Sequence, residues 1–140
     1  MELTANANQE VAANADILFT ETAVRGNCSM IHREGSGLVT LRGLNNNQCR
    51  ARFYVYFGSN IAVPTGQTVG PISLAIAING EAVPTSSVIS TPAAVEEYNN
   101  VSAAIFVDVP NGCCTTISIK NTSAISVEVQ NANLIIERVA

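Results

Sequence analysis

The sequence predicts an all-β protein built as an antiparallel β-sandwich. Apolar residues alternate with polar ones along almost the whole chain, which is the period of a strand with one buried face. Clusters of turn residues separate these runs at short intervals. The chain has 140 residues, of which 47% are hydrophobic, enough for one domain with its own core. About eight to ten short strands without helices indicate a sandwich or jelly roll.

The N-terminal half begins with a segment that lacks a clear strand pattern. We expect residues 1–8 to be a tail or an anchor, ahead of a single jelly-roll domain that spans residues 9–140. The first predicted strands follow at residues 10–12, 17–19, 28–32 and 38–41. Polar turn residues separate these four runs, so each is expected to be a short strand.

Residues 49–57 form the clearest strand in the sequence. Every second residue is apolar and is expected to face the core, namely Ala51, Phe53, Val55 and Phe57. The opposite face carries guanidinium and phenol groups, from Arg50, Arg52, Tyr54 and Tyr56. A face of this composition is typical of a half-buried interface.

The C-terminal half continues the alternation. Strands are predicted at residues 72–78, 101–109, 116–120, 125–129 and 134–136. An Asn-Gly pair follows each of the first two runs and indicates a tight turn. The stretches at residues 64–67 and 84–92 are predicted to be loops, and residues 92–98 are the only, short, helix candidate.

Composition argues against nucleic-acid and membrane proteins. The net charge is −4 and Lys120 is the single lysine, so a basic patch for nucleic acid is not expected. No run approaches the roughly 18 apolar residues of a membrane span, and the N-terminus lacks the pattern of a signal peptide. Only 13% of residues are charged, which favours a protein whose faces are covered by other subunits. We expect synthesis in the cytoplasm and a final place on a virion or another extracellular particle.

Catalytic and metal-binding patterns are absent from the sequence, so we expect neither an enzyme nor a bound cofactor. His32 is the only histidine, and no nucleophile motif accompanies it. The carboxylates of Glu96, Glu97 and Asp108 are the metal-ligand candidates, but they do not have the spacing of a calcium loop. Solvated surface charges explain these three residues better.

The four cysteines are Cys28, Cys49, Cys113 and Cys114, and they do not have zinc-finger spacing. Because successive strand residues face opposite sides, we expect Cys113 and Cys114 to point apart. One of them would then pair with Cys28 or Cys49, which leaves the other for a neighbouring subunit. Four reduced thiols are the alternative.

Aromatic side chains on the second face of a strand are the stronger functional signal. Phe106 lies on the face of its strand opposite Ile105 and Val107, as Tyr54 and Tyr56 lie opposite the core residues of theirs. Such residues form either a second core layer or a seam between subunits. We expect Arg52, Tyr54, Tyr56 and Phe106 to form a subunit interface.

Several segments resemble the tumour-necrosis-factor-like and complement-globular-head jelly rolls, which include bacterial spore-surface tips. They are residues 9–14 leading into 17–19, residues 32–36 before 38–41, the run 72–80 with its Asn-Gly turn, and the closing run 126–136. The resemblance implies a jelly roll of about ten strands, a homotrimer and a non-catalytic role. No collagen-like Gly-X-Y stalk is present, which argues against a stalk tip. More narrowly, the chain resembles small proteins of phages and prophages of gut Firmicutes.

These observations lead to three functional hypotheses. The first is an assembly protein, a homotrimer that decorates a phage head or forms part of a fibre or tail and contacts other virion proteins. The second is a module that binds a host-surface glycan at an aromatic-lined site, either between subunits or in the loops at residues 43–48 and 84–92. The third is a disulfide-linked filament subunit of a spore or cell surface.

Overall fold

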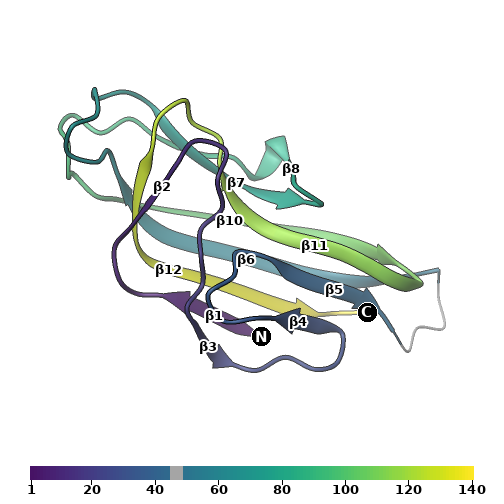
Figure 1. Cartoon of the computed structure of the whole chain (residues 1–140). Coiled ribbons are helices and arrows are strands. Elements are labelled where there is room, and N and C mark those ends of the chain that lie inside the picture. The colour runs from purple at the N-terminus through teal and green to yellow at the C-terminus, as the bar shows by residue number, and fades with distance from the viewer. Residues whose placement is uncertain (45–48) are drawn as a thin grey trace.

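The protein is an antiparallel β-sandwich, as the alternation predicts (Figure 1). The computed structural model describes residues 1–44 and 49–140. The first sheet, sheet A, contains β1 (Glu2–Ala5), β2 (Gln9–Val11), β3 (Glu21–Val24), β6 (Arg50–Ala62), β10 (Asn99–Pro110) and β12 (Val127–Arg138). Sheet B contains β4 (Met30–His32), β5 (Val39–Gly43), β7 (Ile72–Ile78), β8 (Glu81–Ala82), β9 (Val88–Ser90) and β11 (Gly112–Asn121). A short 3₁₀ helix, η1 (Pro84–Ser86), precedes β9.

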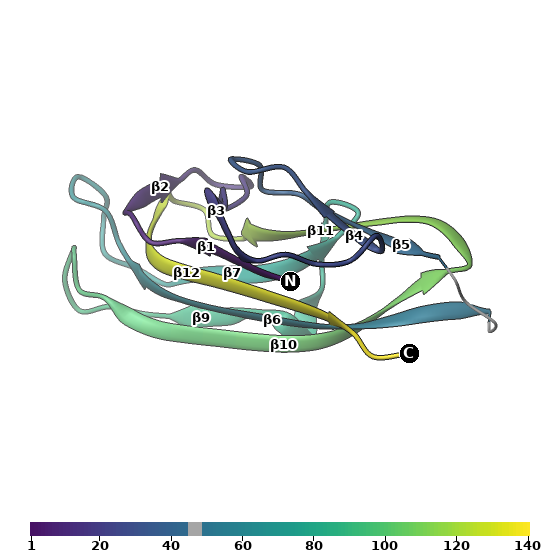
Figure 2. The same cartoon turned by 90° about the horizontal axis from the view of Figure 1, so that it is seen from below.

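Long strands form the centre of each sheet, and sheet B ends in short strands on both sides, whereas sheet A ends in the short β3 on one side and the long β10 on the other. Sheet A runs β10-β6-β12-β1-β3, with β2 paired to the start of β12. Sheet B runs β4-β5-β11-β7-β8, with β9 paired to the start of β7. Figure 2 shows the two layers edge-on, with β6, β10 and β12 on one side and β5 and β11 on the other. Every strand pair is antiparallel, so one face of each sheet is free to point outward.

The core lies between the sheets and follows the alternation of the long strands. On β6 the inward residues Ala51, Phe53, Val55 and Phe57 are at most 1% exposed. β7, β11 and β12 contribute a second set from their inward faces, namely Ile72, Leu74, Ile76, Ile117, Ile119, Leu134 and Ile136. Burial of these side chains is the main favourable contribution to folding, at about 1.5–3 kcal/mol for each large one.

One buried asparagine joins three parts of the chain at the end of the sandwich. Asn121, at the end of β11, is fully buried, and its Nδ2 donates to the carbonyl oxygens of Val11 and Ile125 at 2.9 Å each. Its Oδ1 accepts from the Ser123 N–H at 2.8 Å. The amide therefore has partners on both sides, as a buried polar group requires.

Residues 1–8, which were expected to be a tail or an anchor, include a strand of sheet A. Strand β1 lies between β12 and β3, with Glu2 opposite Ile135 and Thr4 opposite Asn133. Leu3 is fully buried in the core, and the amino group of Met1 donates to the Ile136 carbonyl oxygen at 2.8 Å. The expected tail is therefore an integral strand, whose length of four residues gave too little alternation to be recognised.

Three further expectations differ from the structure. Residues 17–19 form no ladder strand, although Ile17 and Phe19 are fully buried. Residues 92–98 contain bends and turns in place of the helix candidate. The two strands expected at 125–129 and 134–136 are one strand, β12. The polar residues between them form a β-bulge at Asn131 (φ 56°), and the strand continues through it. Within the described residues, no helix is long and apolar enough to span a bilayer.

The position of β1 predicts the effect of truncating its buried side chain. Leu3→Ala should lower the free energy of unfolding by about 2–5 kcal/mol, because the change leaves a cavity in the core. Thr4→Ala, on the outward face of the same strand, is the matched control and should cost far less. Urea unfolding of both variants measures this, and equal midpoints would contradict the placement of β1 in the sheet.

Candidate functional site

The outer face of sheet A brings together the four residues that the sequence singled out. The pairing of β10 with β6 places Phe106 opposite Tyr54 and Asp108 opposite Arg52, with Tyr56 two residues further along β6. The rings of Tyr54 and Phe106 meet edge to face, with centroids 5.7 Å apart and an interplanar angle of 62°. We call Tyr54, Tyr56 and Phe106 the aromatic platform; Phe106 is 64% exposed on it.

Tyr56 lies flat on the sheet because the residue two positions along the strand is glycine. A β-carbon on Gly58 would come within 2.9 Å of the Tyr56 hydroxyl oxygen and 3.4 Å of its ring. Any other residue at position 58 would therefore push the ring away from the strand. The glycine lets the aromatic face of Tyr56 point outward from the protein surface.

A paired carboxylate bounds the platform at one end. Asp108 accepts from Arg52 through two parallel bonds, Nε to Oδ1 at 2.8 Å and Nη2 to Oδ2 at 3.0 Å. Arg50 Nε lies 3.0 Å from Oδ2 of the same carboxylate. The hydrogen bond from Arg52 holds the pKa of Asp108 below its usual range, so this end of the face carries fixed ionic groups at neutral pH.

A row of asparagines bounds the platform at the other end and crosses the sheet. Asn100 on β10 donates to Asn60 on β6 at 3.1 Å, and Asn60 donates to Asn131 on β12 at 3.2 Å. Asn131 donates in turn to Asn6, which follows β1. Each amide is thereby held in one orientation, and the row presents polar groups along a line on the surface.

This asparagine row was not among the residues predicted from the sequence. Asn60 and Asn100 lie just beyond the strands as they were expected, and Asn131 was assigned to a break between strands. The alternation of inward and outward residues along each strand could have revealed the row. Asn60 and Asn100 share the outward parity of Tyr56 and Phe106, so longer strands would have placed both on the same face.

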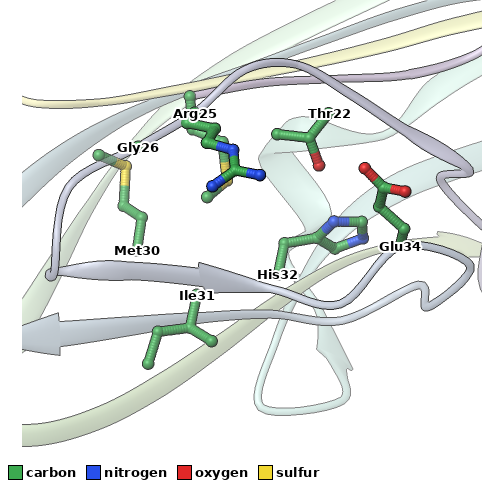
Figure 3. Close-up of a pocket in the computed structure, with 8 residues that line it drawn as sticks. Thr22, Arg25, Gly26, Met30, Ile31, His32 and Glu34 are labelled. Carbon is green, nitrogen blue, oxygen red and sulfur yellow. The ribbon is translucent and has the colours of Figure 1, made fainter.

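An open groove of about 520 Å³ lies elsewhere, between the end of β3 and strand β4 (Figure 3). Its lining combines charged, polar and apolar side chains, from Met1, Thr22, Arg25, Gly26, Met30, Ile31, His32 and Glu34. His32 Nε2 donates to the Ser36 carbonyl oxygen at 3.0 Å, which leaves Nδ1 as a buried acceptor without a partner in the described residues. The histidine therefore stabilises the turn after β4. The groove lining contains no serine or cysteine that could act as a nucleophile beside it.

The cysteines are not arranged as expected. The structure joins Cys113 to Cys114, and neither is bonded to Cys28 or Cys49, which are exposed and free. The expectation that the two neighbours point apart fails because the pairing of β11 with β5 is irregular between Gly112 and Thr115, so strict alternation does not hold there. No cysteine bridges distant parts of the described chain.

Two carboxyl groups lie near the buried hydroxyl oxygen of Tyr98 at the end of the sandwich near β2. Glu96, before β10, and Glu128, on β12, lie close enough for each carboxyl group to shift the pKa of the other. This contact raises the pKa of Glu128, with burial as the second cause, and it lowers the pKa of Glu96. Burial and the nearby carboxylates raise the pKa of Tyr98 to about 12. In the described residues, no group of histidine, cysteine and acidic side chains could hold a metal ion.

Of the two loops expected to bind a glycan, the one at residues 84–92 is not an aromatic-lined site in the structure. Residues 84–92 form η1 and β9 in sheet B, and this stretch contains no aromatic residue. The other loop, residues 43–48, lies largely outside the described residues, since only 43 and 44 are described.

Comparison with known proteins gives likeness of architecture alone. No protein-family model matches the chain, and no curated protein is significantly similar to it. A sugar-binding protein, the EclA C-terminal domain, aligns over 95% of this chain and 80% of its own, with 12% identity and a TM-score of 0.41. A family 35 carbohydrate-binding module from Clostridium thermocellum aligns over 92% and 98%, with 14% identity and a TM-score of 0.36.

A third structure is the CBM22-1 xylan-binding domain from Paenibacillus barcinonensis Xyn10C, which covers 99% of this chain and 87% of its own at 11% identity and a TM-score of 0.37. Likeness at this level transfers neither a ligand nor a site residue to this chain. These three structures are sugar-binding domains, and none of them is a tumour-necrosis-factor-like or phage protein.

The Glu96–Glu128 contact predicts a pH-dependent stability. Because folding raises the pKa of Glu128, its stabilising contribution is complete below the ordinary value of 4.5 and is lost as pH rises through the raised value. Glu128→Gln removes this titrating group, so the free energy of unfolding should decline less as the pH rises above 4.5 than in the parent. Denaturant titrations across this range test the difference. The nearby variant Glu97→Gln should keep the parent's slope, and a parental slope in Glu128→Gln would refute the assignment.

Proposed function

We propose that this protein is a non-catalytic binding module that recognises carbohydrate chains on the outer face of sheet A. The observation that carries the proposal is the aromatic platform, with an asparagine row at one end and a paired carboxylate at the other. Tyr56 and Phe106 present ring surface to solvent, and the polar groups on either side are fixed by their own hydrogen bonds. The face is thus organised before a ligand arrives.

Sugars match this surface in both their apolar and their polar parts. The C–H groups on one face of a pyranose ring carry a small positive charge, and an aromatic ring presents a negative face to them. The hydroxyl groups around the ring both donate and accept, and amides, carboxylates and guanidinium groups are planar partners for them. A ligand with an apolar face and a polar edge therefore fits the platform and its two borders.

The shape of the face favours a chain over a single sugar. Along β6 the polar borders lie at Arg52 and Asn60, a separation of roughly 26 Å at 3.3 Å per strand residue. The surface is open, so it cannot enclose a small ligand as a deep pocket does. Several linked sugar rings could lie along it, with aromatic contacts in the middle and polar contacts at both ends.

The second candidate function is assembly as a homotrimer on a virion or another particle surface. It is favoured by the large apolar residues that this same face exposes, since Phe106 is 64% and Val24 55% exposed. In such a trimer the platform, with Arg52 beside it, would be covered by sister subunits. Carbohydrate binding therefore requires the platform to be free, whereas assembly as a trimer would bury it.

Binding to a panel of immobilised polysaccharides tests the first function. The wild-type protein should bind at least one of them, and Tyr56→Ala and Phe106→Ala should each weaken binding by about tenfold to a hundredfold, as loss of an aromatic anchor does. Ile89→Ala is the control, because Ile89 is 69% exposed on sheet B, away from the platform. Absence of binding together with a native mass of three times 14.7 kDa would favour assembly instead.

Gly58 offers a test that leaves all three aromatic residues in place. Gly58→Ala should lift the Tyr56 ring from the strand and weaken carbohydrate binding, while Tyr54 and Phe106 stay where they are. Gly66→Ser, in a turn outside the strands, is the matched glycine control; its own effect should be on stability, since Gly66 has a φ of 93°. Calorimetric titration with the polysaccharide identified above measures both variants, and unchanged affinity in Gly58→Ala would count against a flat Tyr56 as part of the site.

A further inference from the structure

Strand β10 is a long edge strand with one side unpaired. Among the described residues its backbone pairs with β6 alone, over the whole run from Asn99 to Pro110 and without a bulge. Figure 2 shows it along the lower margin of the sandwich. In an antiparallel pair, alternate N–H and C=O groups point away from the partner, so half of the backbone groups of β10 face outward along this margin.

The other edge strands of the two sheets are short, and this limits edge-to-edge pairing with another chain. β3 and β4, at one side of the sandwich, have four and three residues, and the pairing of β3 with β1 is irregular. β8 and β9, on the side of β10, have two and three residues. Proteins commonly avoid edge-to-edge association in this way, and β10, with 12 residues, departs from the pattern.

The inward side chains of β10 are also incompletely covered. Val101, Ala103 and Ile105 pack on the core but stay partly exposed, whereas Phe57 and Val55, the β6 partners of Ala103 and Ile105, are at most 1% exposed. The apolar side chains along the first half of β10 are thus only partly covered, with β9 near the start of the strand, where Asn99 Nδ2 donates to Ser90 Oγ at 3.0 Å. A further strand beside β10 would cover these apolar side chains as well as the outward backbone groups.

Charge does not protect this edge. Asp108 is the only charged residue in β10, and the two arginines of β6 already neutralise it within the same subunit. The strand has no lysine or inward-pointing charge, and its single proline is at the last position, Pro110. Lysine, inward-pointing charge and proline within the strand usually prevent edge strands of two subunits from pairing.

We propose that two copies of the chain pair through β10, antiparallel about a two-fold axis, so that sheet A continues from one subunit into the other. Side chains opposite each other must point to the same face, so full-length pairing is centred on Ala104 or on Ile105. Asp108 of one copy then faces Asn100 or Ser102 of the other, and no like charges meet. A strand that presents the same apolar pattern from both copies is complementary to itself.

Native mass measures this association directly. In a Cys28→Ser, Cys49→Ser background, which removes the two free thiols, light scattering should give twice 14.7 kDa, with dissociation on dilution. Ala103→Lys places a charge that points inward at the open edge and should reduce the mass to 14.7 kDa. Ala103→Val, the matched control, keeps an apolar side chain there and should leave the dimer intact.

Hydrogen exchange separates loss of pairing from loss of folding. The outward amides of β10 should exchange slowly in the dimer and quickly in Ala103→Lys, while amides of β6 and β12 stay protected in both. A monomeric or trimeric parent, or a dimer that survives Ala103→Lys, overturns the proposal. The platform lies on the outer face and stays free, so the monomeric variant should still bind carbohydrate at each site. Failure of dimerisation is therefore distinguishable from failure of the proposed function.

Discussion

The pleat of β6 is the constraint on which the rest of the structure depends. One strand must place Phe53, Val55 and Phe57 in the core while its other face points to solvent. A slip of one residue would exchange the two faces and bury Arg52. Because β10 and β12 pair with β6 on either side, its register also fixes which of their side chains reach the outer surface. Core and candidate site are therefore two consequences of a single register.

The rigidity of the outer face comes from contacts made within it. The Asp108 carboxylate is held by two arginines from the neighbouring strand, and the asparagine amides hold one another across three strands. Exposed ion pairs of this kind contribute little to stability. Their effect here is on geometry, since they limit the positions that flexible side chains adopt around the aromatic rings. A face prepared in this way loses less conformational entropy when it is covered by a ligand.

Much of the fold and part of the site could be predicted from the sequence. Alternation identified the long strands and placed Arg52, Tyr54, Tyr56 and Phe106 opposite the core residues of their own strands, and the pairing of β10 with β6 brings them onto one face. Local pattern could not reveal β1, because a strand of four residues owes its place to partners at the far end of the chain. It could not join the two halves of β12 either, since the bulge at Asn131 has the composition of a turn.

The pairing of β1 with β12 also bears on how the protein is made. Glu2 lies opposite Ile135, so β1 finds this partner only after β12 has been synthesised. Until then the apolar face of β1 and the unpaired edge of β6 are exposed together. Contacts between such distant residues slow folding and leave partly folded chains open to aggregation. This topology therefore leaves the nascent chain prone to aggregation until β12 has been synthesised.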